Sequence, residues 1–104
     1  MNILGDIGNS DTKIFLVNSK NKIIKRLSLS TKKIDSKILT RKLNLLVGNF
    51  SKIDKILFCS VVPKFFKIIK KILSKKTKVK CHEIKDLRLK SLINIKVNLR
   101  QVGS

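Results

Sequence analysis

The feature that most constrains the fold of this chain is an apolar run that ends in a glycine-containing turn. Ile3 and Leu4 lead into the segment Gly5-Asp6-Ile7-Gly8-Asn9-Ser10-Asp11-Thr12-Lys13. Glycine adopts positive φ or approaches a ligand closely, and asparagine tolerates left-handed geometry, so the pattern predicts a tight turn between two strands. The hydroxyls of Ser10 and Thr12 can donate to phosphate oxygens. The segment therefore predicts a phosphate-binding turn, or an ordinary hairpin turn in which Gly, Asn and Asp serve geometry alone.

The acidic residues of this segment favour the phosphate-binding alternative. The chain has 25 Lys and Arg against 6 Asp and Glu, yet Asp6 and Asp11 fall within the first eleven residues and no lysine precedes Lys13. A bare carboxylate repels a nucleotide, whereas one that holds hydrated Mg²⁺ helps to bind it, because Mg²⁺ takes one or two carboxylates together with substrate phosphates. We therefore interpret Asp6 as a candidate metal ligand, with turn formation as the competing explanation.

The net charge of +19 would ordinarily indicate nucleic acid or an anionic membrane as partner. The lysines are instead scattered through every segment and interleaved with Ile and Leu, a bias that an AT-rich coding sequence produces. Trp and Tyr are absent, and the five Phe residues form no evident platform for base stacking. We therefore expect nonspecific attraction to polyanions and no specific nucleic-acid partner, with a basic nucleic-acid-binding domain as a further alternative.

The two cysteines, Cys59 and Cys81, lie in apolar runs without a CxxC pair, and His82 is the only histidine. This spacing predicts small buried core residues and no metal centre built on Cys or His. The chain has no pattern typical of a signal peptide and no apolar stretch near the ~20 residues that a membrane helix needs. We therefore expect a cytoplasmic protein without a membrane partner.

Hydrophobic periodicity predicts an α/β protein with a mixed sheet in the order β-β-β-α-β-α-β. Strands are expected over 2–6, 12–17 and 22–29, joined as antiparallel hairpins, and over 55–61 and 78–84. Asp35 is expected to cap a helix over 36–50, and a second helix is expected to begin at Pro63. The predicted inward faces are Leu39, Leu43, Leu46 and Phe50 on the first helix, and Phe65, Ile68, Ile69 and Ile72 on the second.

Four segments, in this order, resemble the N-terminal part of the type III pantothenate kinases. Asp6-Ile7-Gly8-Asn9-Ser10 is similar to the family's Asp-Ile-Gly-Asn-Thr, and the segment from Arg26 to Thr31 resembles an Arg and Thr near the end of its third strand. Ser60-Val61-Val62-Pro63 matches a Ser-Val-Val-Pro segment, and Gln101-Val102-Gly103-Ser104 resembles the approach to Gly-Ala-Asp-Arg. The resemblance spans the whole chain, which is about half a family member.

The resemblance implies a ribonuclease H-like N-terminal lobe of the actin, hexokinase and Hsp70 type. Residues 1–104 would form a single nucleotide-binding lobe, with 87–104 as a connector toward a second lobe. Gly103 and Ser104 would border the substrate pocket, and Asp6 would hold the metal. The residues implied to contact ATP phosphates are Asp6, Ile7, Gly8, Asn9, Ser10, Asp11, Thr12 and Lys13.

The activity that the resemblance implies is ATP-dependent phosphorylation of pantothenate, the first step of coenzyme A biosynthesis. The resemblance also implies ATP, Mg²⁺ and a monovalent cation (K⁺ or NH₄⁺) as cofactors, and a homodimer as the assembly. The family's catalytic Asp would follow Ser104, so the 104-residue chain is expected to lack turnover by itself. Lys96 or Val97 stands where the family has an aromatic residue, and Leu99 replaces its loop proline. The alternative is a catalytically dead remnant that keeps nucleotide binding or a dimerisation surface.

Overall fold

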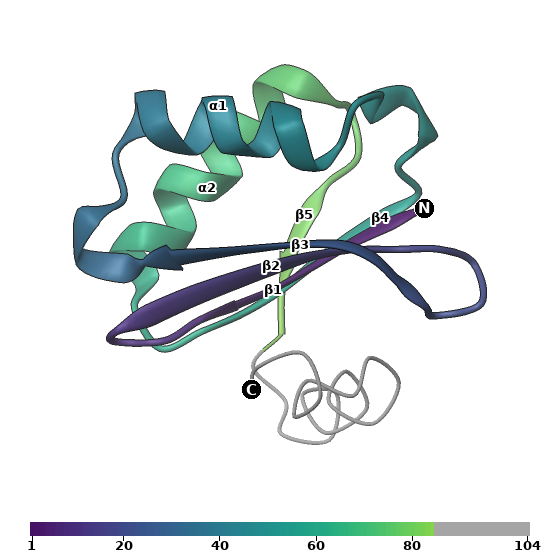
Figure 1. The fold of residues 1–104 in the computed structure, drawn as a ribbon. Helices are drawn as coiled ribbons and strands as arrows, with labels where there is room; N and C mark the ends of the chain where they lie inside the picture. The colour runs from purple at the N-terminus through teal and green to yellow at the C-terminus, as the bar shows by residue number, and fades with distance from the viewer. Residues whose placement is uncertain (85–104) are drawn as a thin grey trace.

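The computed structural model describes residues 1–84, which form one five-stranded sheet with two helices on the same face (Figure 1). The predicted connector at 87–104, with Gly103 and Ser104, lies outside the described residues. The strands, in chain order, are β1 (Asn2–Ile7), β2 (Asp11–Val17), β3 (Ile23–Ser30), β4 (Lys55–Ser60) and β5 (Cys81–Glu83). Their order in the sheet is β3-β2-β1-β4-β5.

The sheet is mixed, as predicted from the sequence. β1 pairs antiparallel with β2 and β2 with β3, whereas β4 pairs parallel with β1 and with β5. The antiparallel strands follow one another through short turns, and the parallel strands are reached through helices, which is the connection that parallel pairing requires. The α/β class, the element order and the ribonuclease H-like arrangement of strands are therefore confirmed.

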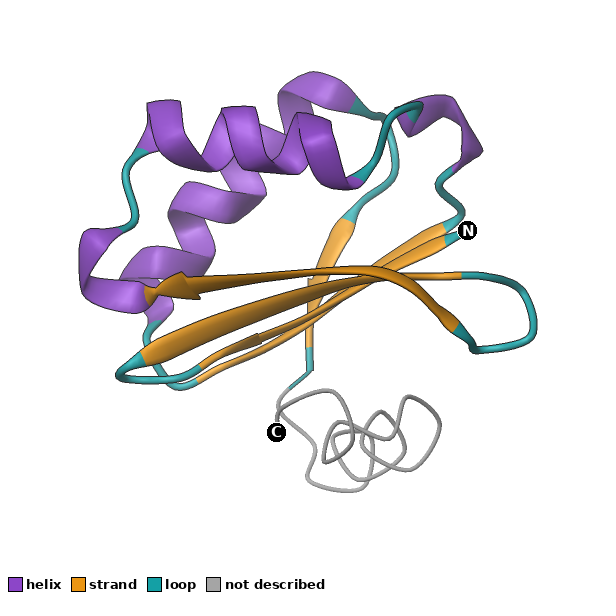
Figure 2. Ribbon diagram, in the orientation of Figure 1, coloured by secondary structure: helices purple, strands orange, loops and turns teal. Residues whose placement is uncertain are grey.

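Two helices, α1 (Ser36–Leu46) and α2 (Pro63–Lys76), cover one face of the sheet (Figure 2). The Asp35 side chain caps α1 by accepting a hydrogen bond from the Ile38 N–H at 2.8 Å, an interaction that contributes about 1 kcal/mol in comparable helices. Pro63 opens α2, where its missing N–H costs no helical hydrogen bond. Both predicted helix starts are confirmed.

The first helix ends four residues earlier than the sequence predicts. Gly48 is a poor helix former, and the Asn49 carboxamide accepts hydrogen bonds from the N–H and hydroxyl of Ser51, which favours a local turn over a continued helix. A 3₁₀ turn, η2 (Phe50–Lys52), follows. Phe50 still packs against the core, so its predicted inward position is confirmed although its predicted helix is not.

Two further predictions differ from the structure, namely the inward face of the second helix and the start of the last strand. The buried residues of α2 are Phe66, Ile69, Ile72 and Leu73, whereas Phe65 and Ile68 are only half-buried, because the helix is rotated about its axis relative to the predicted face. β5 begins at Cys81 and not at residue 78, since the Val79 N–H bonds to the Thr77 hydroxyl at 3.2 Å and the chain there forms a local turn.

The main core lies between the sheet and the helices, and a glycine determines how β1 and β4 pack within it. Gly5 of β1 stands opposite Phe58 of β4 in the parallel register. A Cβ atom at Gly5 would overlap the Phe58 ring, which is fully buried and packs against Phe66 with ring centroids 6.1 Å apart. Glycine is thus required here to let the aromatic ring lie over the neighbouring strand.

A smaller cluster occupies the opposite face of the sheet. Its buried members are Leu4, Phe15, Val17 and Cys59. They alternate along their strands with residues of the main core, as the two-residue period of a strand requires. Cys59 here and Cys81 in the main core are both buried and unbridged, so their predicted place in the interior is confirmed.

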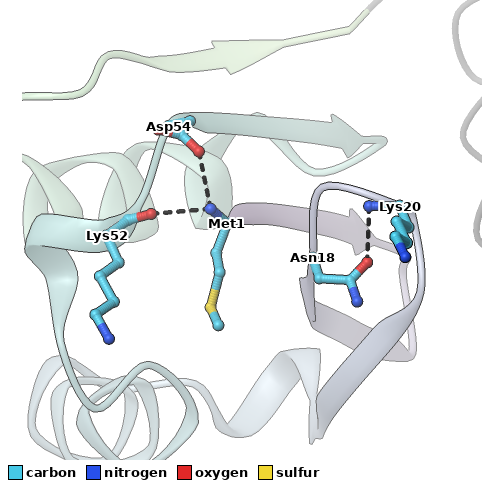
Figure 3. Close-up of polar contacts among 5 residues, drawn as sticks. All are labelled: Met1, Asn18, Lys20, Lys52 and Asp54. Carbon is cyan, nitrogen blue, oxygen red and sulfur yellow. Dashed lines mark hydrogen bonds and ion pairs between the residues drawn. The ribbon is translucent and has the colours of Figure 1, made fainter.

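The end of the sheet where β1 begins is fixed by polar contacts (Figure 3). The Met1 ammonium donates to the Lys52 carbonyl at 2.9 Å and to the Asp54 carboxylate at 2.8 Å. In the β2–β3 loop, the Asn18 side chain accepts a hydrogen bond from the Lys20 N–H at 2.9 Å. Within residues 1–84, no helix is long and apolar enough to cross a membrane.

Candidate functional site

Segments that lie far apart in the chain meet at the other end of the sheet. Because β1 and β4 are parallel, their carboxyl ends lie at the same edge, and the Val61 N–H donates to the Ile7 carbonyl at 3.0 Å. β2 begins and β3 ends at this edge because both pair antiparallel. The sheet thus brings together the turn Gly8–Asp11, Thr31 and the segment 60–63, three of the four segments singled out in the sequence.

The turn between β1 and β2 is closed by a backbone hydrogen bond from the Gly8 N–H to the Asp11 carbonyl, at 2.9 Å. A Cβ atom at Gly8 would stand 3.0 Å from that carbonyl oxygen, so the glycine permits a close backbone approach. Neither Gly8 nor Asn9 uses positive φ, since Asn21 alone among residues 1–84 has this conformation, so close approach is the property of Gly8 that the turn uses. Asn9, Ser10 and Asp11 are exposed, and the turn presents their polar groups to solvent.

Thr31, the residue after β3, holds the turn in place. Its N–H donates to the Ser10 carbonyl at 2.9 Å, and its hydroxyl donates to the Gly8 carbonyl at 2.8 Å. The Thr12 and Thr31 hydroxyl oxygens are also 2.8 Å apart, and both residues are fully buried. Since a hydroxyl has one proton and that of Thr31 goes to Gly8, Thr12 is the donor of this pair. Two hydrogen bonds therefore run in series from the Thr12 hydroxyl through the Thr31 hydroxyl to the Gly8 carbonyl, and together they form a hydroxyl relay.

The sequence did not identify Thr31 as part of a site, although the resemblance included it in a matching segment. The available signal was a threonine directly after a segment in which Leu27 and Leu29 alternate with serines. No local pattern relates Thr31 to Gly8, because the two residues are brought together only by the pairing of β2 with β3.

Asp6 lies one residue before the end of β1, directly opposite Lys13 of β2 and Cys59 of β4. Strand alternation places its side chain on the face away from the helices, since Gly5 and Ile7 face the main core. Asp6 is half-buried, and its carboxylate has neither a hydrogen bond nor an ion pair with the residues that the structure describes. It is an accessible oxygen ligand beside the turn.

Two of the predicted contact residues offer no side-chain group to a ligand. Ile7 is fully buried in the main core, and Thr12 is fully buried with its hydroxyl engaged by Thr31. Asn9, Ser10 and Asp11 are exposed, while Gly8 and Lys13 are half-buried. The candidate ligand surface therefore consists of the exposed turn, flanked by the Asp6 and Lys13 side chains.

The segment between β4 and α2 completes this edge. The Ser60 hydroxyl accepts a hydrogen bond from the Val62 N–H at 3.0 Å, which turns the chain into the helix. The first turn of α2 contains no acidic residue. The N-terminal end of a helix carries a partial positive charge, so this end of α2 favours an anion at the same edge as the turn.

Other surfaces of the described part offer less specific chemistry. Each of the five Phe residues is buried or half-buried, so none forms an exposed stacking surface for bases. Within residues 1–84, His, Cys, Asp and Glu form no cluster of three or more that could hold a metal ion. Cavities of about 480, 450 and 380 Å³ lie away from the turn, against the two helices and β3.

Comparison with known proteins relates the chain as a whole to one family. Residues 2–104 match the family model described as type III pantothenate kinase. The chain is also 56% identical over 104 residues to the type III pantothenate kinase of Pelagibacter ubique (strain HTCC1062). That match covers 100% of this chain and 42% of the relative, so the chain spans less than half the length of this curated relative.

Proposed function

The chain belongs to the type III pantothenate kinase family, and from this premise we propose that it serves in the phosphorylation of pantothenate by ATP, the first step of coenzyme A biosynthesis. The family relation supports the kinase activity in this proposal. Within this function, we assign to residues 1–84 the binding of the nucleotide phosphates. The observation that supports this assignment is that the Gly8–Asp11 turn is held by Thr31 and lies at the same edge of the sheet as the start of α2.

The turn is suited to phosphate because its exposed residues supply donors in a fixed frame. The close backbone contact at Gly8 and the buried hydroxyl relay from Thr12 limit the motion of the turn, so little conformational entropy would be lost on binding. Ser10 and Asn9 add side-chain donors, and Lys13 adds a positive charge on the adjacent strand. In this proposal, Ile7 and Thr12 serve to position the turn and do not contact the phosphates.

Asp6 fits the role of a magnesium ligand. It is a hard oxygen ligand, half-buried beside the turn, and none of the described residues engages it. Mg²⁺ takes one or two carboxylates and completes its shell with water and phosphate, so a single carboxylate beside the turn fits it. A bound Mg²⁺ would neutralise charge on the phosphates. The proposal extends to the monovalent cation and homodimer that the resemblance implies.

Isothermal titration of the 104-residue chain with MgATP tests the phosphate site. The variants are Asp6→Asn and, as a matched control, Asp54→Asn at the opposite end of the sheet. Each substitution removes one negative charge, so nonspecific attraction of ATP to this basic chain should rise equally in both. We expect the Asp6 variant to bind MgATP about tenfold more weakly, which corresponds to ~1.4 kcal/mol, and the Asp54 variant to bind like the wild type.

The same titration in EDTA separates metal binding from charge. Without Mg²⁺ the Asp6 carboxylate only repels ATP, so Asp6→Asn should then bind at least as well as the wild type. Circular dichroism verifies that both variants are folded. Equal MgATP affinities for all three proteins, or binding that disappears as salt rises to physiological levels, would contradict the proposed site.

A further inference from the structure

Among residues 1–84, no strand pairs with the outer edge of β3. The Thr31 N–H bonds to the Ser10 carbonyl, and the antiparallel register then directs the backbone groups of Leu29, Leu27 and Lys25 toward β2. The alternate residues Ser28 and Ser30 direct their N–H and carbonyl groups away from the sheet. β3 is eight residues long, and an edge of this length is a template for a further strand.

A groove runs between this edge and α1. This β3–α1 groove has a volume of about 380 Å³, and its lining includes Lys25, Leu27, Arg41, Lys42 and Leu45. Lys25, Arg41 and Lys42 form no ion pair with any residue in the described part of the chain. The groove thus concentrates uncompensated positive charge beside unpaired backbone groups.

The groove also has an exposed apolar rim. Leu45 is 70% exposed and Ile38 38% exposed, the first within the groove and the second two helical turns before it. Together with Arg41 and Lys42, these residues occupy positions i, i+3, i+4 and i+7 of α1, which lie on one side of a helix. Such a mixture of exposed apolar and basic residues is typical of a surface that binds another chain.

We propose that the β3 edge and the β3–α1 groove dock an extended acidic polypeptide segment, which adds to the sheet as a strand beside β3. The backbone of the segment would bond to Ser28 and Ser30, its acidic side chains would meet Arg41, Lys42 and Lys25, and an apolar side chain would cover Leu45. A second copy of this chain offers few acidic side chains to the groove, since it has 6 Asp and Glu against 25 Lys and Arg. This inference does not depend on the proposed nucleotide site, which lies at the carboxyl ends of β1 and β4 and not along β3.

The probe is a fluorescent eight-residue peptide in which Glu, Leu, Glu and Glu alternate with Thr, so that the acidic and apolar side chains share one strand face. Its binding to the 104-residue chain is measured by anisotropy at 0.15 M salt. Arg41→Glu reverses one charge of the groove. Ser28→Pro removes an outward N–H, a change that edge strands tolerate. Lys71→Glu makes the same charge change as Arg41→Glu on the exposed surface of α2.

We expect saturable binding that weakens about tenfold in Arg41→Glu and in Ser28→Pro and changes less than twofold in Lys71→Glu. Circular dichroism verifies the fold of each variant, and Arg41→Glu keeps the test decisive if Ser28→Pro unfolds. Equal losses in Arg41→Glu and Lys71→Glu, or equal binding of a peptide with Lys in place of Glu, would overturn the proposal. So would tighter binding of a single-stranded RNA that displaces the peptide, or self-association that Ser28→Pro abolishes.

Discussion

The hydroxyl relay beneath the phosphate turn gives a prediction with a definite order of effects. Thr12 donates to Thr31, and Thr31 donates to the Gly8 carbonyl, with both oxygen-to-oxygen distances at 2.8 Å. Replacing either threonine by valine keeps the shape of the side chain and removes one hydroxyl. The two substitutions differ because the relay has a direction.

Thr31→Val removes both hydrogen bonds and leaves the Thr12 hydroxyl buried without a partner. Loss of the bond to the Gly8 carbonyl costs about 1 kcal/mol, and stranding the buried Thr12 donor costs about 1–3 kcal/mol, so we expect the free energy of unfolding to fall by about 2–4 kcal/mol. Thr12→Val removes one bond only, and Thr31 still donates to Gly8. Its expected cost is about 1 kcal/mol.

The double variant provides the control. Once Thr12 is valine, no donor is stranded by Thr31→Val, so the second substitution should cost about 1 kcal/mol, less than it does alone. Urea unfolding of the four proteins gives the coupling energy of this cycle directly. A Thr12→Val cost equal to or larger than that of Thr31→Val, or strict additivity in the double variant, would refute the relay.

Two further predictions concern the core. Gly5→Ala should lower the free energy of unfolding by about 1–3 kcal/mol, because its methyl group would displace the buried Phe58 ring. Gly48→Ala is the control and should not destabilise the protein, since no atom lies within 4 Å of a Cβ at that position. Urea unfolding midpoints compare the two variants. Burial raises the pKa of the Cys81 thiol from 9.0 to about 12, with Lys70 acting weakly in the opposite sense. Because the pKa of the thiol is higher in the folded protein, the stability gained from the protonated thiol is present below pH 9 and is lost as the pH rises toward 12. The urea midpoint of the wild type should therefore fall more steeply between pH 9 and 11 than that of Cys81→Ala. Parallel slopes for the two proteins would contradict the pKa shift.

Local chemistry let the sequence predict most of the fold. Asp35 caps a helix and Pro63 opens one because these preferences depend on a few neighbouring residues. Apolar runs located all five strands, since burial of one or both faces of a strand leaves a short-range pattern. The errors lay at element ends, where Asn49 and Thr77 bond to the nearby backbone and stop a helix or delay a strand.

The sequence by itself determined which residues form the candidate turn, because Gly8 and the polar residues after it restrict what that segment can become. Tertiary structure alone decided that Thr31 fixes this turn, that Thr12 turns its hydroxyl inward, and that the 60–63 segment lies alongside. Hydrogen bonds between residues 19 or more positions apart leave no local pattern in a chain. They exist only after strand pairing has set the register, and that register depends on the burial of whole strand faces.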